Sequence, residues 1–178
     1  MKKVILGSLI ATSCLIGTVV SADQGSEVHL GYNHISIDNS NNTTGEEGLL
    51  GWNYALPLTV LGNGDNTGME VGFGWDIGVG SIGGDTGGSN GFYNGNAKIF
   101  VGYQYHGLHI RGGGGYGFLK INGSNNSYTG AEYIASIGYK FTKKYGVEVA
   151  YKDSTMSQTG GPDVDFNNIG VNFIINWN

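Results

Sequence analysis

Residues 69–79 alternate strictly between large apolar side chains and glycines or acids. The apolar residues stand at the odd positions from Met69 to Val79, and the even positions hold Glu70, Asp76 and three glycines. Successive side chains of a β-strand point to opposite faces, so one face of this segment is apolar and the other is polar and nearly empty. The pattern recurs along the chain behind an export signal. It therefore predicts a barrel with lipid outside and a polar lumen rather than a soluble sheet.

The N-terminus has the features of an export signal. Lys2 and Lys3 precede an uncharged apolar run over residues 4–20, and residues 20–22 (Val-Ser-Ala) fit a small-residue cleavage site. We therefore expect a signal peptide over residues 1–22 and a single mature domain over residues 23–178. The single cysteine of the chain lies inside this signal, so the mature domain is expected to contain no disulfide and no cysteine-metal site.

The charge of the mature chain restricts its partners. The chain has nine Lys and Arg residues, two of which leave with the signal, and the remaining seven face fourteen acids for a net charge of −7. A negative chain is not expected to bind nucleic acid, which requires a basic face. No segment after residue 22 approaches the uninterrupted apolar length of a membrane-spanning helix, so membrane insertion has to be made by strands.

Eight strand-like segments follow, each about as long as a tilted strand needs to cross a bilayer. They run near residues 27–38, 49–56, 69–80, 92–105, 108–121, 131–141, 145–153 and 166–177. Pro57 and Pro162 fall outside them, as expected because proline cannot donate to a β-ladder. We therefore predict an all-β fold, an eight-stranded antiparallel transmembrane up-and-down β-barrel, after a cleaved signal peptide.

The apolar faces of these segments are expected to face lipid. Their aromatic residues cluster toward the strand ends, where the interfacial girdles of membrane barrels lie. The expected lipid-facing or girdle positions are Trp52, Tyr54, Phe73, Trp75, Tyr103, Tyr105, Tyr133, Tyr139, Tyr151, Phe173 and Trp177. In the first segment the apolar alternation changes phase after Tyr32, which predicts a β-bulge that turns Ile35 and Ile37 outward.

The connections between the segments alternate in length. The long ones are expected to be extracellular loops, at residues 39–48, 81–91, 122–130 and 154–165. The short ones, at 106–107 and 142–144, are expected to be periplasmic turns. The first periplasmic connection, residues 57–68, is long for this scheme and leaves room for a mispaired strand.

The two-residue turn at 106–107 fixes the register of the strands that it joins. Counting back from this turn, Phe100 pairs with Gly113. Both side-chain positions point inward, so the Phe100 ring is expected to cover the glycine-rich segment 112–115.

The segment Gly138-Tyr-Lys-Phe-Thr-Lys-Lys-Tyr-Gly-Val-Glu-Val-Ala-Tyr151, the other alternating strands and the aromatic C-terminal strand resemble one known group of proteins. This is the family of small eight-stranded outer-membrane barrels of the OmpA, OmpX and opacity-protein type. The resemblance covers residues 23–178 and implies a location in the cell outer membrane of a Gram-negative-type bacterium. It also implies contact with membrane lipid and lipopolysaccharide, and recognition of the C-terminal strand by the barrel-assembly machinery. In one departure, Asn178 follows Trp177, where the family's assembly signal ends on the aromatic residue.

Charged residues also occur at inward positions of the predicted barrel. By parity, four acids and four bases point into the lumen and leave it formally neutral: Glu70, Asp76, Lys98, Arg111, Glu132, Lys140, Glu148 and Lys152. Because an isolated buried ion is very costly, these charges need partners. We expect a salt-bridge network that braces the barrel, with a small ion path gated by the same charges as the alternative.

No catalytic, cofactor or metal site is expected. His34-Ile-Ser36 is the only His-x-Ser sequence; lipid A deacylases, which are barrels of this size, carry such a pair near the C-terminus with Asn next, whereas Ile37 follows here. Residues 163–167 space their oxygen ligands like a calcium loop but lack its glycine and closing glutamate.

The sequence therefore favours a non-enzymatic outer-membrane barrel with a structural or surface-interaction, adhesion-like role through its extracellular loops. Three alternatives stay open. One is a small porin-like channel, and another is a secreted, soluble glycine-rich β-protein. The third is a lipid A-modifying enzyme that would depend on His34 or Ser36. Loop composition does not identify an extracellular ligand.

Overall fold

The computed structural model describes residues 25–38, 43–57, 68–83, 89–123, 127–158 and 161–177. Eight strands lie within these ranges: β1 (Ser26–Asp38), β2 (Thr43–Pro57), β3 (Gly68–Gly83), β4 (Ser89–Tyr105), β5 (Leu108–Ile121), β6 (Ser127–Lys140), β7 (Tyr145–Ser157) and β8 (Val164–Trp177). The expected signal peptide lies outside the described residues. The described part of the chain contains no helix long and apolar enough to cross a membrane.

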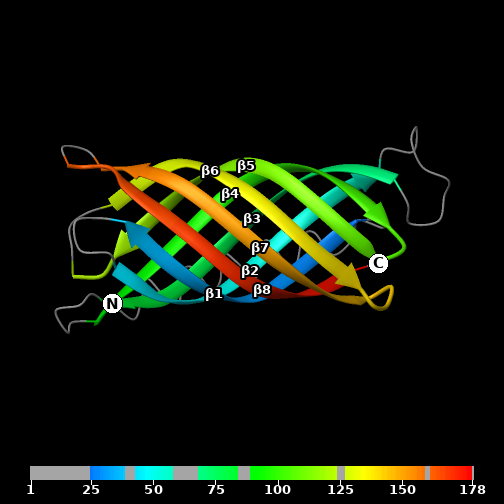
Figure 1. Cartoon of the computed structure of the whole chain (residues 1–178), viewed down its shortest axis with the longest axis horizontal. Coiled ribbons are helices and arrows are strands. Elements are labelled where there is room, and N and C mark those ends of the chain that lie inside the picture. The colour runs from blue at the N-terminus through cyan, green and yellow to red at the C-terminus, as the bar shows by residue number, and fades with distance from the viewer. Residues whose placement is uncertain are drawn as a thin grey trace.

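The sheet closes on itself. Each strand pairs antiparallel with its neighbours in sequence, and β1 pairs with β8, so the eight strands form one barrel without a free edge (Figure 1). This arrangement confirms the predicted eight-stranded antiparallel up-and-down barrel. It is neither a sandwich nor a solenoid, either of which a soluble glycine-rich β-protein could form.

The strands reach farther than expected at the end that carries the longer connections, which we call the loop end. β2 already begins at Thr43, β3 runs to Gly83 and β7 runs to Ser157, so the segments expected as loops are partly strand. The shortest strands have 13 residues and the longest has 17, against the roughly 9–11 that a tilted strand needs to cross a bilayer. The barrel is therefore longer than the hydrocarbon layer is thick.

The opposite end, which we call the turn end, carries the short connections at 106–107 and 141–144. At this end β2 also finishes, at Pro57, and β3 begins, at Gly68; residues 58–67 between them are outside the described part of the chain. The strands that flank these residues, β2 and β3, pair with each other continuously from Thr44–Gly83 to Pro57–Glu70. These two strands are therefore paired in the predicted order.

The bulge predicted in the first strand is wrong. β1 pairs continuously with both β2 and β8 up to Ile37. Ile35 and Ile37 point into the barrel, where they are 0% and 1% exposed. The side chains keep one alternation along the whole strand. What changes after Tyr32 is the chemistry of the two faces, because His34 is now outside and the apolar residues are inside.

The register predicted from the β4–β5 turn is confirmed, since Phe100 pairs with Gly113. His106 (φ 46°) and Gly107 (φ 89°) both adopt the left-handed conformation that a two-residue hairpin turn of this kind requires.

The expected position of the Phe100 ring is only partly right. The ring points inward, but its far end lies over Gly72 of β3, at the place where a side chain at position 72 would stand. The guanidinium carbon of Arg111 lies 5.1 Å from the ring centroid. The far end of the ring therefore fills the space above a glycine on the neighbouring strand β3, and it is the Cα and Cβ of Phe100 that lie beside Gly113.

Candidate functional site

The outer wall of the barrel is covered with apolar side chains. Among them, Ile99 and Tyr133 are 70% and 73% exposed. Eight of the eleven expected lipid-facing or girdle residues are exposed on this wall: Phe73, Tyr103, Tyr105, Tyr133, Tyr139, Tyr151, Phe173 and Trp177. So much apolar surface on a closed barrel matches a bilayer and not water.

The other three expected wall residues, Trp52, Tyr54 and Trp75, are half-buried on the same face. Trp52 pairs with Trp75 across β2 and β3, and the Trp52 ring centroid lies 6.3 Å from that of Tyr54. The ring of Phe73 lies 5.8 Å from Trp52 and 5.6 Å from Tyr54. These rings form one aromatic group on the outer face of β2 and β3.

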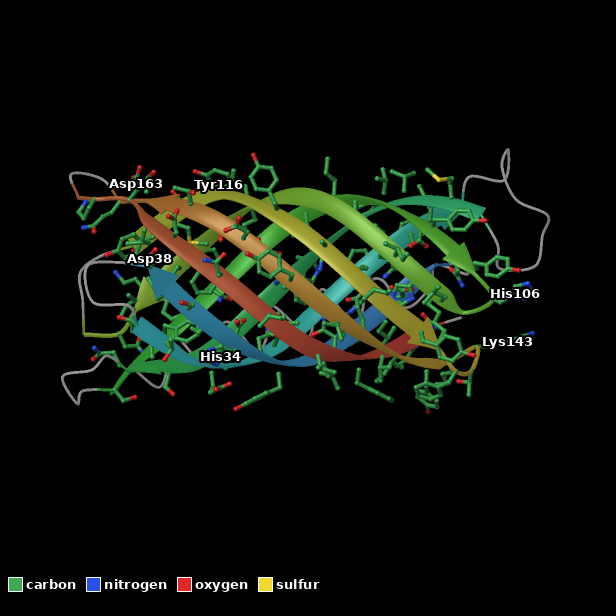
Figure 2. The ribbon with its side chains drawn as sticks, in the orientation of Figure 1. His34, Asp38, His106, Tyr116, Lys143 and Asp163 are labelled. Carbon is green, nitrogen blue, oxygen red and sulfur yellow. The ribbon has the colours of Figure 1, made fainter. Side chains whose placement is uncertain are left out.

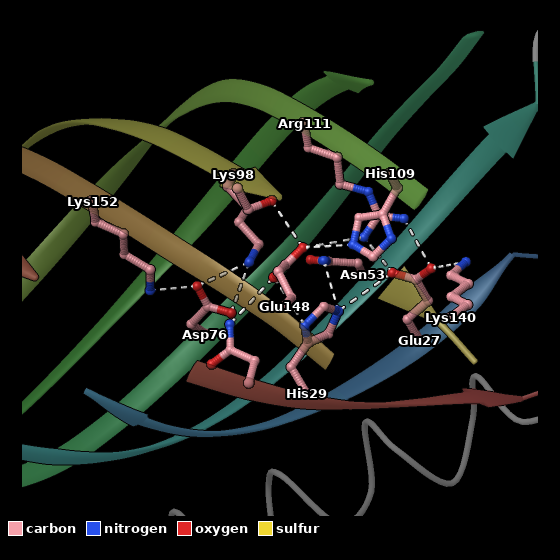
Figure 3. Close-up of polar contacts among 12 residues, drawn as sticks. Glu27, His29, Asn53, Asp76, Lys98, His109, Arg111, Lys140, Glu148 and Lys152 are labelled. Carbon is pink, nitrogen blue, oxygen red and sulfur yellow. Dashed lines mark hydrogen bonds and ion pairs between the residues drawn. The ribbon is translucent and has the colours of Figure 1, made fainter. Parts of the chain in front are cut away.

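Inside the barrel, seven ionisable side chains gather toward the turn end, and Figure 3 labels all of them except Glu70. We call them the turn-end cluster: Glu27, His29, Glu70, His109, Arg111, Lys140 and Glu148. Arg111 of β5 connects the cluster. Its Nη2 donates to Glu27 of β1 at 2.9 Å, and its Nε donates to Glu70 of β3 at 2.5 Å. One guanidinium thus links strands on different sides of the barrel.

Two buried histidines belong to the same cluster. His29 lies between two carboxylates, with Nε2 3.4 Å from Glu27 and Nδ1 3.5 Å from Glu148. His109 places its Nε2 3.1 Å from the other oxygen of Glu148. Lys140 completes the cluster with its Nζ 2.6 Å from Glu27.

A second group of polar side chains occupies the middle of the lumen. This mid-lumen cluster consists of Glu47, Asp76, Asn96, Lys98, Glu132, Lys152 and Asn168. Asp76, which is 3% exposed, accepts hydrogen bonds from Lys98 at 2.8 Å and from Lys152 at 2.6 Å. The two remaining acids bind amides: Asn96 donates to Glu132 at 2.5 Å, and Asn168 donates to Glu47 at 2.6 Å.

The lumen is more acidic than predicted. All eight charged residues expected to point inward lie in these two clusters, but Glu27 and Glu47 are also buried, each at 1% exposure. Six acids therefore face four bases, and the expectation of a formally neutral interior is wrong. Glu27 and His29 alternate with outward Val28 and Leu30, so the same parity rule applied to the first strand could have found them. Glu47 was missed because β2 begins before the residue predicted.

At the loop end the filling of the lumen changes from charged to apolar. Nine buried side chains among the described residues form what we call the loop-end plug: Ile35, Ile37, Ile82, Phe92, Leu119, Tyr128, Met156, Val164 and Phe166. Leu119 and Met156 are 0% exposed. Sequence reasoning missed this cluster because it assigned Ile35 and Ile37 to the lipid face and several of the other positions to loops.

No protein-family model matches this sequence, and no curated protein is similar to it in sequence. Among solved structures, the barrel is similar to neisserial surface protein A (NspA), with a TM-score of 0.59 at 11% identity over 85% of this chain and 97% of that one. The chain has the fold of the small outer-membrane barrels. It is likewise similar to Ail, the attachment invasion locus protein of Yersinia pestis, with a TM-score of 0.52 at 13% identity over 85% of this chain and 99% of that one.

A second Ail structure, in complex with the heparin analogue sucrose octasulfate, matches with a TM-score of 0.50 at 14% identity over 84% of this chain and 97% of that one. At these identities the likeness is one of fold. The apolar outer wall is separate evidence, from this chain itself, for a barrel that spans a membrane.

The closed barrel also places the remaining sequence candidates on its outer wall. His34 Nδ1 lies 3.2 Å from the Glu46 carboxylate, and both side chains are about half exposed. At the supposed calcium loop, Asp165 accepts a hydrogen bond from Thr155 at 2.9 Å, and Asn167 accepts one from Tyr151 at 3.0 Å. Within the described residues, no group of three or more His, Cys, Asp or Glu side chains could hold a metal ion.

Proposed function

We propose that this protein is a non-enzymatic integral outer-membrane barrel with a closed lumen, a structural role in the membrane and a loop end that meets the cell exterior. The observation that carries the proposal is the loop-end plug. A conducting pore needs a hydrated path along its whole length, and at the plug that path is occupied by buried apolar side chains such as Ile35, Leu119 and Met156. Eight strands enclose only enough room for side chains, which agrees with a filled interior.

The loop end is the surface on which we place any extracellular interaction. Asp38, Asp153, Asp163 and Asp165 are exposed there, and Lys120 is the only lysine or arginine on the outer surface of this end among the described residues, since Lys152 points into the lumen. Figure 2 shows Asp38 and Asp163 at this end and His106 and Lys143 at the opposite one. Like charges across an interface are unfavourable. We therefore infer that a partner is neutral or cationic, unlike the sulfated heparin analogue bound to Ail.

The same proposal includes the molecules that contact the outer wall and the C-terminal strand. The apolar wall contacts membrane lipid and lipopolysaccharide, and the outward Phe173 and Trp177 of β8 supply the aromatic pattern of an assembly signal. A test of membrane integration is heat-modifiability of the mature chain, from Asp23, refolded from urea into detergent micelles. We expect an unboiled sample to migrate differently from a boiled one and to resist protease. A chain that folds fully in buffer without detergent would contradict membrane integration.

Conductance in a planar bilayer tests the closed lumen. We expect no discrete steps from the native barrel, and steps from a variant in which Phe92→Ala and Phe166→Ala open the loop-end plug. A matched control, Phe73→Ala with Phe118→Ala, removes the same two rings from the outer wall and should stay silent. If the native barrel conducts, and Lys98→Gln changes its conductance, the protein is a small channel and the proposal of a closed lumen fails.

A further inference from the structure

The turn-end cluster lacks one positive charge. It holds three carboxylates, those of Glu27, Glu70 and Glu148, but only two permanent cations, Arg111 and Lys140. The three acids are between 1% and 6% exposed, so water does not compensate the excess. An unbalanced buried charge costs several kcal/mol even after the surroundings relax. The cluster therefore requires either a protonated acid or a further base.

The geometry of His29 supplies that base. Each of its two ring nitrogens faces a different carboxylate, Glu27 at 3.4 Å and Glu148 at 3.5 Å. A neutral imidazole has one N–H and one lone pair, so one of these carboxylates would face a lone pair. An imidazolium carries an N–H on both nitrogens and can donate to both acids. We propose that His29 binds a proton and serves as the third cation of the turn-end cluster.

His109 differs from His29 although it shares Glu148. Its Nε2 lies 3.1 Å from that carboxylate, but its Nδ1 has no hydrogen-bond partner among the described residues. A second N–H at this buried position would be left unpaired, which costs about 1–3 kcal/mol. The neutral tautomer with the proton on Nε2 satisfies Glu148 without that cost. The geometry thus assigns one charged and one neutral histidine to the same carboxylate.

With the amide of Asn53 turned by half a rotation, the groups around His29 accommodate one bound proton. Glu27 faces it from its own strand, Glu148 from β7, and Asn53 from β2, with the amide nitrogen of Asn53 2.9 Å from Nε2. In this rotamer the Asn53 oxygen has no partner; a half-turn of the amide presents this oxygen to the Nε2 proton. Asn172 of β8 donates to Glu148 at 3.2 Å. The remaining charged groups, on β3, β5 and β6, are Glu70, Arg111 and Lys140.

Proton release from His29 is expected to loosen the turn end. The bound proton stabilises the folded barrel, and this stabilisation is lost as the pH rises and His29 becomes neutral, because three carboxylates then face two cations. The effect is independent of whether the lumen conducts and of what the loops bind. The turn-end cluster is thus a binding site for one proton inside the lumen, and the stability of the barrel is expected to decrease under alkaline conditions.

Nitrogen NMR of the barrel with ¹⁵N-labelled histidine, in micelles between pH 5 and 9, tests the assignment directly. At pH 7 we expect both ring nitrogens of His29 to carry protons and His109 to show a single Nε2–H tautomer. The variant His29→Gln identifies the His29 signals by their loss. A His29 ring with only one protonated nitrogen at pH 7 would overturn the proposal. The measurement is made on the native barrel, and the His29→Gln variant serves only to assign the signals.

The pH dependence of urea unfolding gives the second test. Between pH 6 and 9 we expect the unfolding midpoint of the native barrel to fall, and the midpoint of His29→Gln to lose most of that dependence. His106→Gln, in the exposed β4–β5 turn, is the matched control and should keep it. Equal pH dependence in the native barrel and in His29→Gln would contradict a proton held at position 29.

Discussion

Replacing Asp76 with Asn should destabilise the barrel by about 3–5 kcal/mol, the usual cost of removing one partner from a buried ion pair. The Asp76 carboxylate is the shared partner of two ammonium groups, Lys98 at 2.8 Å and Lys152 at 2.6 Å, in a part of the lumen where Asp76 is 3% exposed. Asn keeps the size of the side chain but not its charge. The substitution therefore leaves two cations in a narrow space without their common counter-ion, and it creates no large cavity.

Equilibrium unfolding in urea, followed by tryptophan fluorescence in micelles, measures this loss. Asp153→Asn is the matched control, because it removes the same charge from the exposed outer wall of β7 and should change the unfolding free energy by no more than about 0.5 kcal/mol. Adding Lys152→Met to Asp76→Asn removes one of the two stranded cations and should restore part of the stability, so the two substitutions are not additive. If Asp76→Asn is as stable as Asp153→Asn, the mid-lumen ion pairs do not brace the barrel.

Three further substitutions, with Thr155→Arg as a control, test the two faces of the wall by the same unfolding assay. Val101→Arg or Ile137→Arg, at exposed apolar positions, should each lower the free energy of unfolding by about 2–4 kcal/mol where the residue lies near the bilayer midplane. Thr155→Arg, on the polar outer wall near the loop end, should lower it little. Equal small effects at all three sites would mean that positions 101 and 137 do not face lipid. Leu119→Ala, in the loop-end plug at 0% exposure, should cost about 2–5 kcal/mol through the cavity that it leaves; a change below about 1 kcal/mol would show that the plug is not closely packed.

The strand number, the order of pairing and the β4–β5 register could all be predicted from the sequence, because each depends on a local rule. Alternation fixes the face of a side chain, and a two-residue turn fixes the pairing of Phe100 with Gly113. The direction of the Phe100 ring could not be predicted in this way. It depends on the empty space above Gly72, which belongs to a strand nearly thirty positions earlier in the chain and becomes a neighbour only when the sheet forms.

The candidate site was harder to predict than the fold because ion partners in a barrel come from strands that are not neighbours in sequence. Parity places Arg111 in the lumen, but only the closed sheet brings it to Glu27 of β1 and Glu70 of β3 together. The burial of Glu27 and Glu47 was not predicted for a different reason. Both residues lie near the predicted ends of their strands, where assignment to a loop or to a strand decides whether a charged side chain is solvated or buried.

The error at Ile35 and Ile37 indicates where this barrel leaves the membrane. In the middle of the barrel, apolar side chains such as Ile99 and Ile137 are outside and charged ones are inside. Near the loop end the same strands place the loop-end plug inside and polar residues such as His34 outside, as in a soluble protein. A bulge would exchange the two faces by shifting the register, but β1 has none, so the exchange lies in the sequence itself. Apolar side chains turn toward lipid where lipid surrounds the wall and toward the lumen where water does. The level at which β1 changes, between Tyr32 and His34, is therefore the expected outer boundary of the hydrocarbon layer, and the plug lies beyond it.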